Sequence, residues 1–158
     1  MKISVVIPCY NEEQTVLQIV KMVQGVLVDN EYEIIIIDDL STDNTKQVID
    51  SIIANDNAVK AVYHDKNMGK GAALRSGFNR SNGGVIIIQD ADLEYDPNEY
   101  IKLLEPIMTG KADVVYGSRF KSGAEARVLY YWHRLGNLFL TWLSNIFTNL
   151  NLTDMETC

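Results

Sequence analysis

The feature that most constrains the fold is a regular alternation of short apolar runs with amphipathic stretches. The apolar runs are rich in β-branched residues and span residues 3–7, 34–37, 59–63, 85–88 and 114–116. Runs of this kind are typical of strands that are buried on both faces of a parallel sheet. Because helix-like stretches separate them, the sequence predicts an α/β fold with a doubly wound, mostly parallel sheet flanked by helices.

Start signals mark the helices between the predicted strands. Asn11, followed by acidic and amide residues at 12–14, is expected to cap the first helix with a capping-box pattern. Ser41 or Asp43 is expected to cap the second. Asp96 precedes a proline, which is favoured at the first helical position, and therefore predicts the start of another helix.

Polar and acidic residues directly follow three of the predicted strands. These segments span residues 8–13, 38–43 and 89–94. In open α/β sheets, ligands bind outside the carboxyl ends of the strands. The three segments therefore predict one binding site at one edge of the sheet.

The segment Asp90-Ala91-Asp92 is the sharpest local signal. In extended backbone, residues two apart point to the same side, so Asp90, Asp92 and Glu94 would present carboxylates together. Oxygen ligands of this kind suit Mg²⁺ or Mn²⁺, which also bind substrate phosphates. The alternative is a solvated acidic loop. The apolar run at 85–88, directly before this segment, favours the metal site. The metal site is also favoured because clustered carboxylates repel one another without a cation.

Two further segments have both a structural and a functional interpretation. Asp39 either belongs to a simple turn or accepts a hydrogen bond from a nucleobase N–H or a ribose hydroxyl. The glycine-rich segment 67–71 enters a predicted helix, where backbone N–H groups can face an anion. Its alternative is a flexible turn with a solvated Lys70.

Composition excludes several classes of protein. The 158 residues suit one globular domain, and 14 Lys and Arg against 21 Asp and Glu give a net charge of -7. That balance argues against nucleic-acid binding, which normally requires a basic face. Two cysteines are too few for a disulfide framework, so we expect a reducing compartment. The N-terminal residues show no signal peptide.

In order and spacing, the chain resembles family 2 glycosyltransferases. The resemblance is carried by residues 5–13, 38–43, 67–71 and 90–94. Gly117-Ser118-Arg119-Phe120 and residues 133–137 resemble the polyprenyl-phosphate branch, the dolichyl-phosphate mannose or glucose synthase-like enzymes. The resemblance covers essentially the whole chain. It implies a GT-A fold and inverting transfer of a sugar from a nucleoside diphosphate sugar to a polyprenyl phosphate.

The resemblance also implies roles for individual residues. Asp92 and Glu94 would hold Mg²⁺ or Mn²⁺, with Asp92 and Arg119 as catalytic residues. Arg119 and Arg134 would meet the acceptor phosphate, whose geometry suits paired arginine donors; the alternative for both is an ordinary surface or capping role. The nucleotide sugar would contact Pro8, Tyr10, Glu12, Ile37, Asp39, Lys70, Asp90 and Ala91.

Two departures from the family pattern stand out. The family usually has glycine where this chain has Leu40, and a leucine does not readily adopt a positive φ, so we expect an altered loop there. Relatives of this kind also continue beyond the position of Cys158. We expect a further segment that completes the acceptor site and often carries membrane helices.

The C-terminal stretch predicts an amphipathic helix. From Leu135 to Leu150, apolar residues recur at helical spacing, interrupted by polar ones, so the helix is not expected to span a membrane. It would lie in a membrane interface or contact a polyprenyl chain, or else pack on the protein. We therefore assign residues 1–127 to a catalytic domain and residues 128–158 to an acceptor or membrane-proximal segment. An exposed apolar helix would also favour homo-oligomers.

These observations predict a metal-assisted glycosyltransferase at the cytoplasmic face of a membrane. UDP-glucose and GDP-mannose are both compatible with the sequence as donors. One alternative is transfer to a glycan hydroxyl, which would require a general base. Another is a nucleotide-binding chain without catalysis.

Overall fold

The computed structural model describes residues 1–118 and 131–155, except for the side chains of Tyr131, His133 and Arg134. The chain forms two compact units, Met1–Asn98 and Glu99–Cys158. The domain boundary expected at residue 127 lies outside the described residues.

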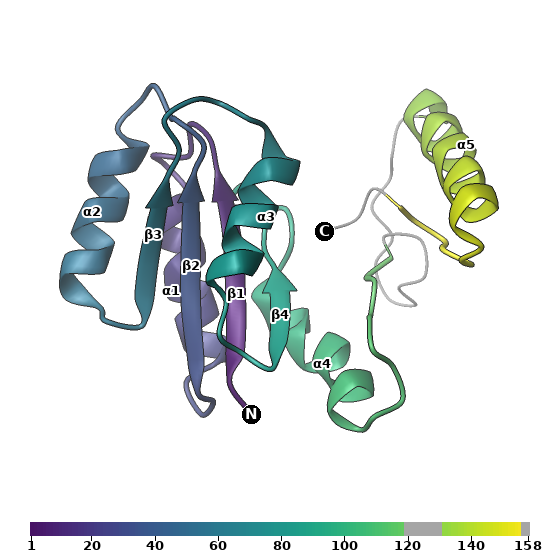
Figure 1. The fold of residues 1–158 in the computed structure, drawn as a ribbon, viewed down its shortest axis with the longest axis horizontal. Helices are drawn as coiled ribbons and strands as arrows, with labels where there is room; N and C mark the ends of the chain where they lie inside the picture. The colour runs from purple at the N-terminus through teal and green to yellow at the C-terminus, as the bar shows by residue number, and fades with distance from the viewer. Residues whose placement is uncertain (119–130, 156–158) are drawn as a thin grey trace. The chain divides into compact units, whose positions relative to one another are not determined.

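The first unit is built on a parallel sheet. Its strands are β1 (Ile3–Cys9), β2 (Tyr32–Asp38), β3 (Val59–Tyr63) and β4 (Val85–Ile88), in the order β3-β2-β1-β4 (Figure 1). The two central strands are almost continuously buried. The first four predicted strands are confirmed, each within a few residues of its expected bounds.

Helices cover both faces of this sheet. α1 (Val16–Val26) and α2 (Thr45–Asn55) lie on one face and α3 (Lys70–Arg80) on the other (Figure 1). The chain runs from β1 outward to β3, then returns through α3 to β4 on the far side of β1. The strand order therefore reverses between β1 and β4, which is the switch point where doubly wound sheets bind ligands. The predicted α/β fold is confirmed.

α3 packs unusually close to the sheet. Its Ala73 joins Val6, Ile35 and Ile37 in a buried cluster. A Cβ atom built on Gly77 would lie 2.3 Å from Val6 Cγ1 and 2.8 Å from Ile37 Cδ1. Only glycine fits this approach, which sets the position of the helix and hence of Lys70 at its start.

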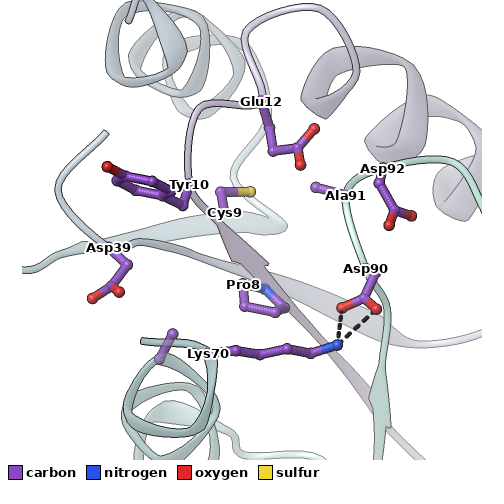
Figure 2. A pocket seen from close by; sticks show the side chains of 10 residues that line it. Pro8, Cys9, Tyr10, Glu12, Asp39, Lys70, Asp90, Ala91 and Asp92 are labelled. Carbon is purple, nitrogen blue, oxygen red and sulfur yellow. Dashed lines mark hydrogen bonds and ion pairs between the residues drawn. The ribbon is translucent and has the colours of Figure 1, made fainter. Parts of the chain in front are cut away.

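Pro8 lies where β1 parts from β4. β1 pairs with β2 as far as Cys9 but with β4 only as far as Val6. Backbone groups alternate in direction along a strand, and the Val6 carbonyl accepts from Gln89 N on the β4 side. The backbone nitrogen of Pro8 faces the same side, beyond the last residue that pairs with β4. The N–H that proline lacks is therefore not needed for a hydrogen bond between strands. The strands diverge there and open the pocket drawn in Figure 2.

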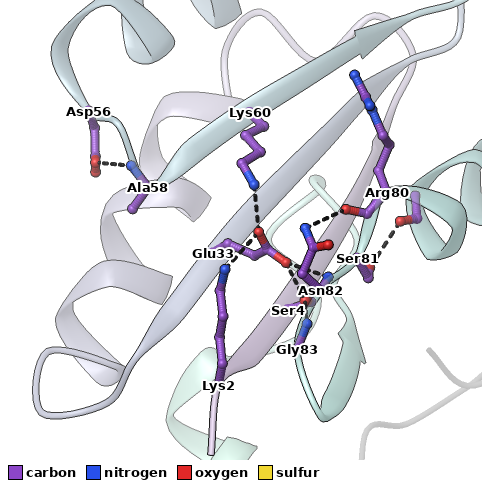
Figure 3. Close-up of polar contacts among 11 residues, drawn as sticks. Lys2, Ser4, Glu33, Asp56, Ala58, Lys60, Arg80, Ser81, Asn82 and Gly83 are labelled. Atoms are coloured by element: carbon purple, nitrogen blue, oxygen red, sulfur yellow. Dashed lines mark hydrogen bonds and ion pairs between the residues drawn. The ribbon is translucent and has the colours of Figure 1, made fainter.

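A polar cluster around Glu33 stabilises the end of the sheet that lies opposite the pocket (Figure 3). The Glu33 side chain is 2% exposed and pairs with Lys60 at 2.7 Å and Lys2 at 3.0 Å. It also accepts hydrogen bonds from Ser4 Oγ at 2.8 Å and Asn82 N at 2.7 Å. Burial raises the pKa of this carboxyl, but the hydrogen bonds outweigh burial and hold the pKa far below its ordinary value. The cluster ties β1, β2, β3 and the segment before β4 together.

The predicted helix caps are confirmed only in part. α1 begins at Val16, five residues after Asn11, and Asn11 does not cap it. Asn11 has a φ of 61° and accepts instead from Thr42 N. Asp43 accepts from the amide of Thr45, the first residue of α2, whereas Ser41 does not cap that helix. Asp96 accepts from Asn98 N and caps a short 3-10 helix, Pro97–Glu99, as expected.

The second unit contains α4 (Tyr100–Met108) and α5 (Tyr131–Thr148). The strand predicted at residues 114–116 is wrong, because this stretch has no regular structure and leaves Val114 67% and Tyr116 54% exposed. A three-residue run supplies few ladder hydrogen bonds, so its apolar composition does not by itself specify a strand.

α5 confirms the predicted C-terminal helix. Its polar face pairs with the segment after it: Asn137 Nδ2 donates to Asp154, and Asn145 exchanges two hydrogen bonds with the backbone of Leu152. Its apolar face is exposed, including Trp142 and Phe147. None of the helices in the described part of the chain is long and apolar enough to cross a membrane.

Candidate functional site

A pocket of about 230 Å³ lies at the switch point between β1 and β4. Its walls come from the carboxyl ends of β1 and β2, the turn after β4 and the start of α3 (Figure 2). The lining residues are Pro8, Cys9, Tyr10, Glu12, Asp39, Lys70, Ala73, Asp90, Ala91 and Asp92.

Most of the predicted site residues meet in this pocket. The predicted residues that line it are Pro8, Tyr10, Glu12, Asp39, Lys70, Asp90, Ala91 and Asp92. Ile37 does not, because its side chain is fully buried in the cluster beneath α3. Glu94 is exposed and is not among the lining residues. Arg119 lies outside the described residues, and Arg134 lies in α5 with an undescribed side chain.

Hydrogen bonds join the loop after β1 to the loop after β2. Asn11 N donates to Ser41 Oγ at 2.9 Å, and Glu12 N donates to Thr45 Oγ1 at 2.7 Å. In return, Thr42 N donates to Asn11 Oδ1 at 2.8 Å. The two loops therefore form one rigid wall that carries Tyr10 and Glu12.

Leu40 adopts the left-handed conformation that the family pattern fills with glycine. Its φ is 61° and its side chain is 45% exposed. The structure therefore places a leucine in a positive-φ conformation that leucine does not readily adopt. This conformation costs a leucine about 1–2 kcal/mol. The hydrogen bonds between the loop that contains Leu40 and the loop after β1 hold the residue in place.

Asp39 is a buried carboxylate of the pocket that accepts several hydrogen bonds. It is 3% exposed and accepts from Met68 N at 3.0 and 3.1 Å, from Gly69 N at 2.6 Å and from His64 Nδ1 at 2.6 Å. Burial raises the pKa of this carboxyl, but these hydrogen bonds outweigh burial and hold the pKa below its ordinary value. The glycine-rich segment is thus an ordered turn fixed by Asp39, and Gly69, with a φ of 83°, suits it.

Lys70 and Asp90 form an ion pair across the pocket. Lys70 Nζ lies 2.6 Å from Asp90 Oδ1 and 2.7 Å from Oδ2, and the lysine extends from the start of α3 toward the turn after β4 (Figure 2). The Lys70 side chain is 52% exposed, so the pair stays in contact with solvent. An ammonium group in this position can bind a phosphate oxygen.

The acidic segment after β4 is a turn. Leu93 has a φ of 63°, Asp92 Oδ1 accepts from Glu94 N at 2.9 Å, and residues 91–92 form a turn. The expectation of an extended backbone with three carboxylates on one side is therefore wrong: the strand ends at Ile88. Gln89 stabilises the turn by donating from Nε2 to the carbonyls of Asp90 and Tyr95.

The pocket fits a divalent cation only if a ligand completes the site. In the described part of the chain, no three His, Cys, Asp or Glu side chains are grouped to hold a metal by themselves. The lining nevertheless contains four carboxyl side chains and one ammonium group, which would repel a diphosphate. Mg²⁺ is usually bound by one or two carboxylates together with substrate phosphates. The donor set suits this mode, with Asp92 exposed at the pocket.

Two residues near the pocket were not predicted from the sequence. Cys9 lines the pocket, and burial, with the nearby carboxylates of Glu12, Asp38 and Asp90, raises the pKa of its thiol, so the sulfur stays protonated. His64 holds Asp39 from outside the lining. Its position directly after β3 was a usable signal, because it follows a strand as the other site residues do.

Comparison with curated proteins gives polyprenyl-phosphate sugar transferases. A dolichol-phosphate mannosyltransferase of Pyrococcus furiosus is 32% identical over 135 residues, covering 85% of this chain and 38% of that protein. A UDP-N-acetylglucosamine–dolichyl-phosphate N-acetylglucosaminyltransferase of Methanococcus voltae is 29% identical over 169 residues, covering 98% of this chain and 66% of that protein. The chain thus spans 38% of the length of the first of these relatives and 66% of the second.

Solved structures share the GT-A fold. Glucosyl-3-phosphoglycerate synthase from Mycobacterium tuberculosis, solved with Mn²⁺, UDP and phosphoglyceric acid, matches with a TM-score of 0.55 and 29% identity over 68% of this chain and 39% of that chain. Residues 1–349 of S. aureus TarS, solved with UDP, match with a TM-score of 0.59 and 22% identity over 77% of this chain and 40% of that chain. The second likeness concerns the fold alone.

The family model for glycosyl transferase family 2 matches residues 4–156, almost the whole chain. Its span includes the whole sheet except Ile3, the first residue of β1, and every residue that lines the pocket. The chain belongs to glycosyl transferase family 2.

Proposed function

We propose that the pocket between β1 and β4 binds a nucleoside diphosphate sugar and that the protein transfers the sugar, with inversion, to a polyprenyl phosphate. The observation that carries this proposal is the convergence of Tyr10, Asp39, Lys70 and Asp90 at the switch point. Relatives whose names include dolichyl-phosphate or dolichol-phosphate sugar transfer support the acceptor class. UDP and GDP sugars both remain donors in this proposal.

In the proposed complex, the polar groups of the pocket divide the donor between them. The Asp39 carboxylate already accepts hydrogen bonds from three groups, those of His64, Met68 and Gly69. An ionised carboxylate offers about four acceptor positions. One more donor, a base N–H or a ribose hydroxyl, therefore suits it. Lys70 would meet a phosphate oxygen, at the expense of its contact with Asp90.

Mg²⁺ or Mn²⁺ would be held by Asp92 together with the donor diphosphate, and when bound it would stabilise the charge that develops on the departing diphosphate. Asp90 lines the same pocket and would share that role once Lys70 turns to the phosphate. Glu94, whose backbone N–H donates to Asp92 Oδ1, is the second proposed metal ligand, although it does not line the pocket.

The proposed transfer needs no dedicated general base. A phosphate oxygen of the acceptor attacks the anomeric carbon from the face opposite the diphosphate, and the bond from that carbon to the diphosphate oxygen breaks. The nucleoside diphosphate leaves with the bonding electron pair. A phosphate monoester is already ionised near neutral pH, since its second pKa is about 6. In the same proposal, Arg119 and Arg134 bind the acceptor phosphate.

The proposal assigns the donor to residues 1–127 and the acceptor side to residues 128–158, at the cytoplasmic face of a membrane. The exposed apolar face of α5, with Trp132 75% and Trp142 58% exposed, supports contact with lipid or with a polyprenyl chain. Self-association through the same face is the alternative, and the sedimentation velocity of the chain with and without lipid vesicles separates the two.

The test is direct transfer. The chain is incubated with UDP-glucose or GDP-mannose, Mn²⁺ and a short polyprenyl phosphate, and the lipid product is measured by mass spectrometry. The proposal predicts a glycosylated lipid phosphate that disappears in Arg119→Ala, with Arg75→Ala, an exposed arginine of α3, as the matched control. Product on a soluble hydroxyl acceptor without lipid would favour the alternative. Nucleotide binding without any transfer would identify a binding chain.

A further inference from the structure

His64 lies behind the pocket, between the end of β3 and α3. Its side chain is 6% exposed, and its two ring nitrogens have different partners. Nδ1 lies 2.6 Å from Asp39 Oδ1, and Nε2 lies 2.8 Å from Ser76 Oγ on α3. The backbone of His64 is fixed as well, because its N–H donates to the Asp38 carbonyl at 2.9 Å.

The partners of His64 determine where its proton lies. Asp39 accepts hydrogen bonds from two backbone amides, so its carboxylate acts as an acceptor toward Nδ1 as well. Nδ1 therefore carries a proton. In the neutral ring, Nε2 is then the acceptor, and the Ser76 hydroxyl donates to it.

Asp39 passes this constraint to the pocket. Its two oxygens accept from Met68 N and Gly69 N, and the next residue is Lys70, the start of α3. Ser76 lies on the same helix, so the chain of hydrogen bonds begins on α3 and ends at Gly69, the N-cap of that helix. A rotation of the Asp39 carboxylate would release the turn that carries Lys70 and would misdirect the acceptor position left for the ligand.

We propose that His64 is a positioning residue for donor binding: its Nδ1–H holds the Asp39 carboxylate and, through it, the Met68–Gly69 turn in the geometry that receives a nucleotide. This inference rests on the proposed function, since it assigns the pocket to a nucleotide. His64 itself does not line the pocket. Its effect therefore falls on donor affinity and not on the bond-making step.

Two substitutions separate the two ring nitrogens. In His64→Asn, the side-chain amide nitrogen takes the place of Nδ1, so the hydrogen bond to Asp39 is kept and the one to Ser76 is lost. In His64→Gln, the side-chain amide takes the place of Nε2 and its oxygen accepts from the Ser76 hydroxyl, so the bond to Ser76 is kept and the one to Asp39 is lost. Both variants remove the ring and its packing, and each therefore controls for the other.

The test measures the Kd of UDP and of GDP, each with Mn²⁺, by calorimetry for the wild type and both variants. We expect His64→Gln to raise the Kd of the nucleotide that binds by about tenfold or more, and His64→Asn to stay within about threefold of the wild type. Hydrogen exchange at the Met68 and Gly69 amides should quicken in His64→Gln and not in His64→Asn. Equal effects of the two variants on affinity and exchange would overturn the inference.

Two further measurements distinguish a failure of the inference from a failure of the proposed function. If the wild type binds neither nucleotide, the proposed function fails, and the exchange of the Met68 and Gly69 amides then decides whether His64 holds the turn through Asp39. If His64→Gln does not fold, the ¹⁵N spectrum of the wild-type imidazole decides it. A proton on Nδ1 supports the positioning role, and a proton on Nε2 alone overturns it.

Discussion

The close approach of α3 to the sheet makes Gly77→Ala an informative perturbation. The added Cβ would lie 2.3 Å from Val6 Cγ1 and 2.8 Å from Ile37 Cδ1, well inside ordinary contact. Both neighbours are fully buried, so they cannot move into solvent. Overpacking of this kind costs about 1–3 kcal/mol, while alanine gains up to about 1 kcal/mol of helix propensity over glycine. The net loss of unfolding free energy should be about 1–2 kcal/mol.

The assay is urea denaturation followed by circular dichroism, with Gly71→Ala as the matched control. Gly71 lies in the same helix, but a Cβ there meets nothing within 4 Å. This variant should therefore be as stable as the wild type or slightly more so. Because α3 carries Lys70, Gly77→Ala should also weaken nucleotide binding. If Gly77→Ala proves as stable as Gly71→Ala, the packing argument is refuted.

Three other substitutions test separate parts of the account. Glu33→Gln should lower the unfolding free energy by about 2 kcal/mol at pH 7, because it breaks a buried ion-pair cluster. The pKa of Glu33 is lowered by folding, so its contribution is present above the unfolded value of about 4.3 and is lost as the pH falls below it. Denaturation from pH 7 to pH 3 should therefore show a steeper loss in the wild type than in Glu33→Gln, and parallel curves would contradict this. Asp92→Asn should keep the circular dichroism spectrum but lose the Mn²⁺-dependent part of nucleotide binding in calorimetry; unchanged metal dependence would exclude Asp92 as a metal ligand. Lys70→Met keeps the aliphatic stem but removes the ammonium group, and should raise the Kd of a nucleoside diphosphate about tenfold while leaving that of the nucleoside unchanged; equal losses for both would indicate a general disturbance of the pocket.

The apolar pattern was sufficient to predict the sheet. The buried central strands are long enough for composition and length to identify them, and the switch point follows from the alternation with helices. Residues 114–116 show the limit of that pattern. Whether an apolar run of three residues forms a strand depends on the segments beside it and not on its own composition. Asn11 shows the limit of local cap signals: its side chain pairs with a loop 31 residues away, a contact that no local spacing reveals.

The pocket was predicted better than its internal geometry. The rule that ligands bind at the carboxyl ends of strands identified the segments that carry Tyr10, Asp39 and Asp90. It did not identify Ile37 as a core residue, because a strand's last apolar positions are alike in sequence whether they face a helix or a ligand. Nor did it reveal that the chain after Asp90 forms a turn at residues 91–92, followed by the left-handed Leu93. His64 was missed because its role depends on a contact with Asp39, 25 residues away, which no local spacing reveals.

The central claim is that a nucleotide binds at the switch point between β1 and β4. The most direct measurement is an NMR titration of the ¹⁵N-labelled chain with UDP and with GDP, in the presence and absence of Mg²⁺. The account predicts metal-dependent shifts of backbone amides at Tyr10, Asp39, Lys70, Asp90 and Asp92, with little change around Glu33 at the far end of the sheet. Shifts confined to other regions, or no shifts with either nucleotide, would contradict it.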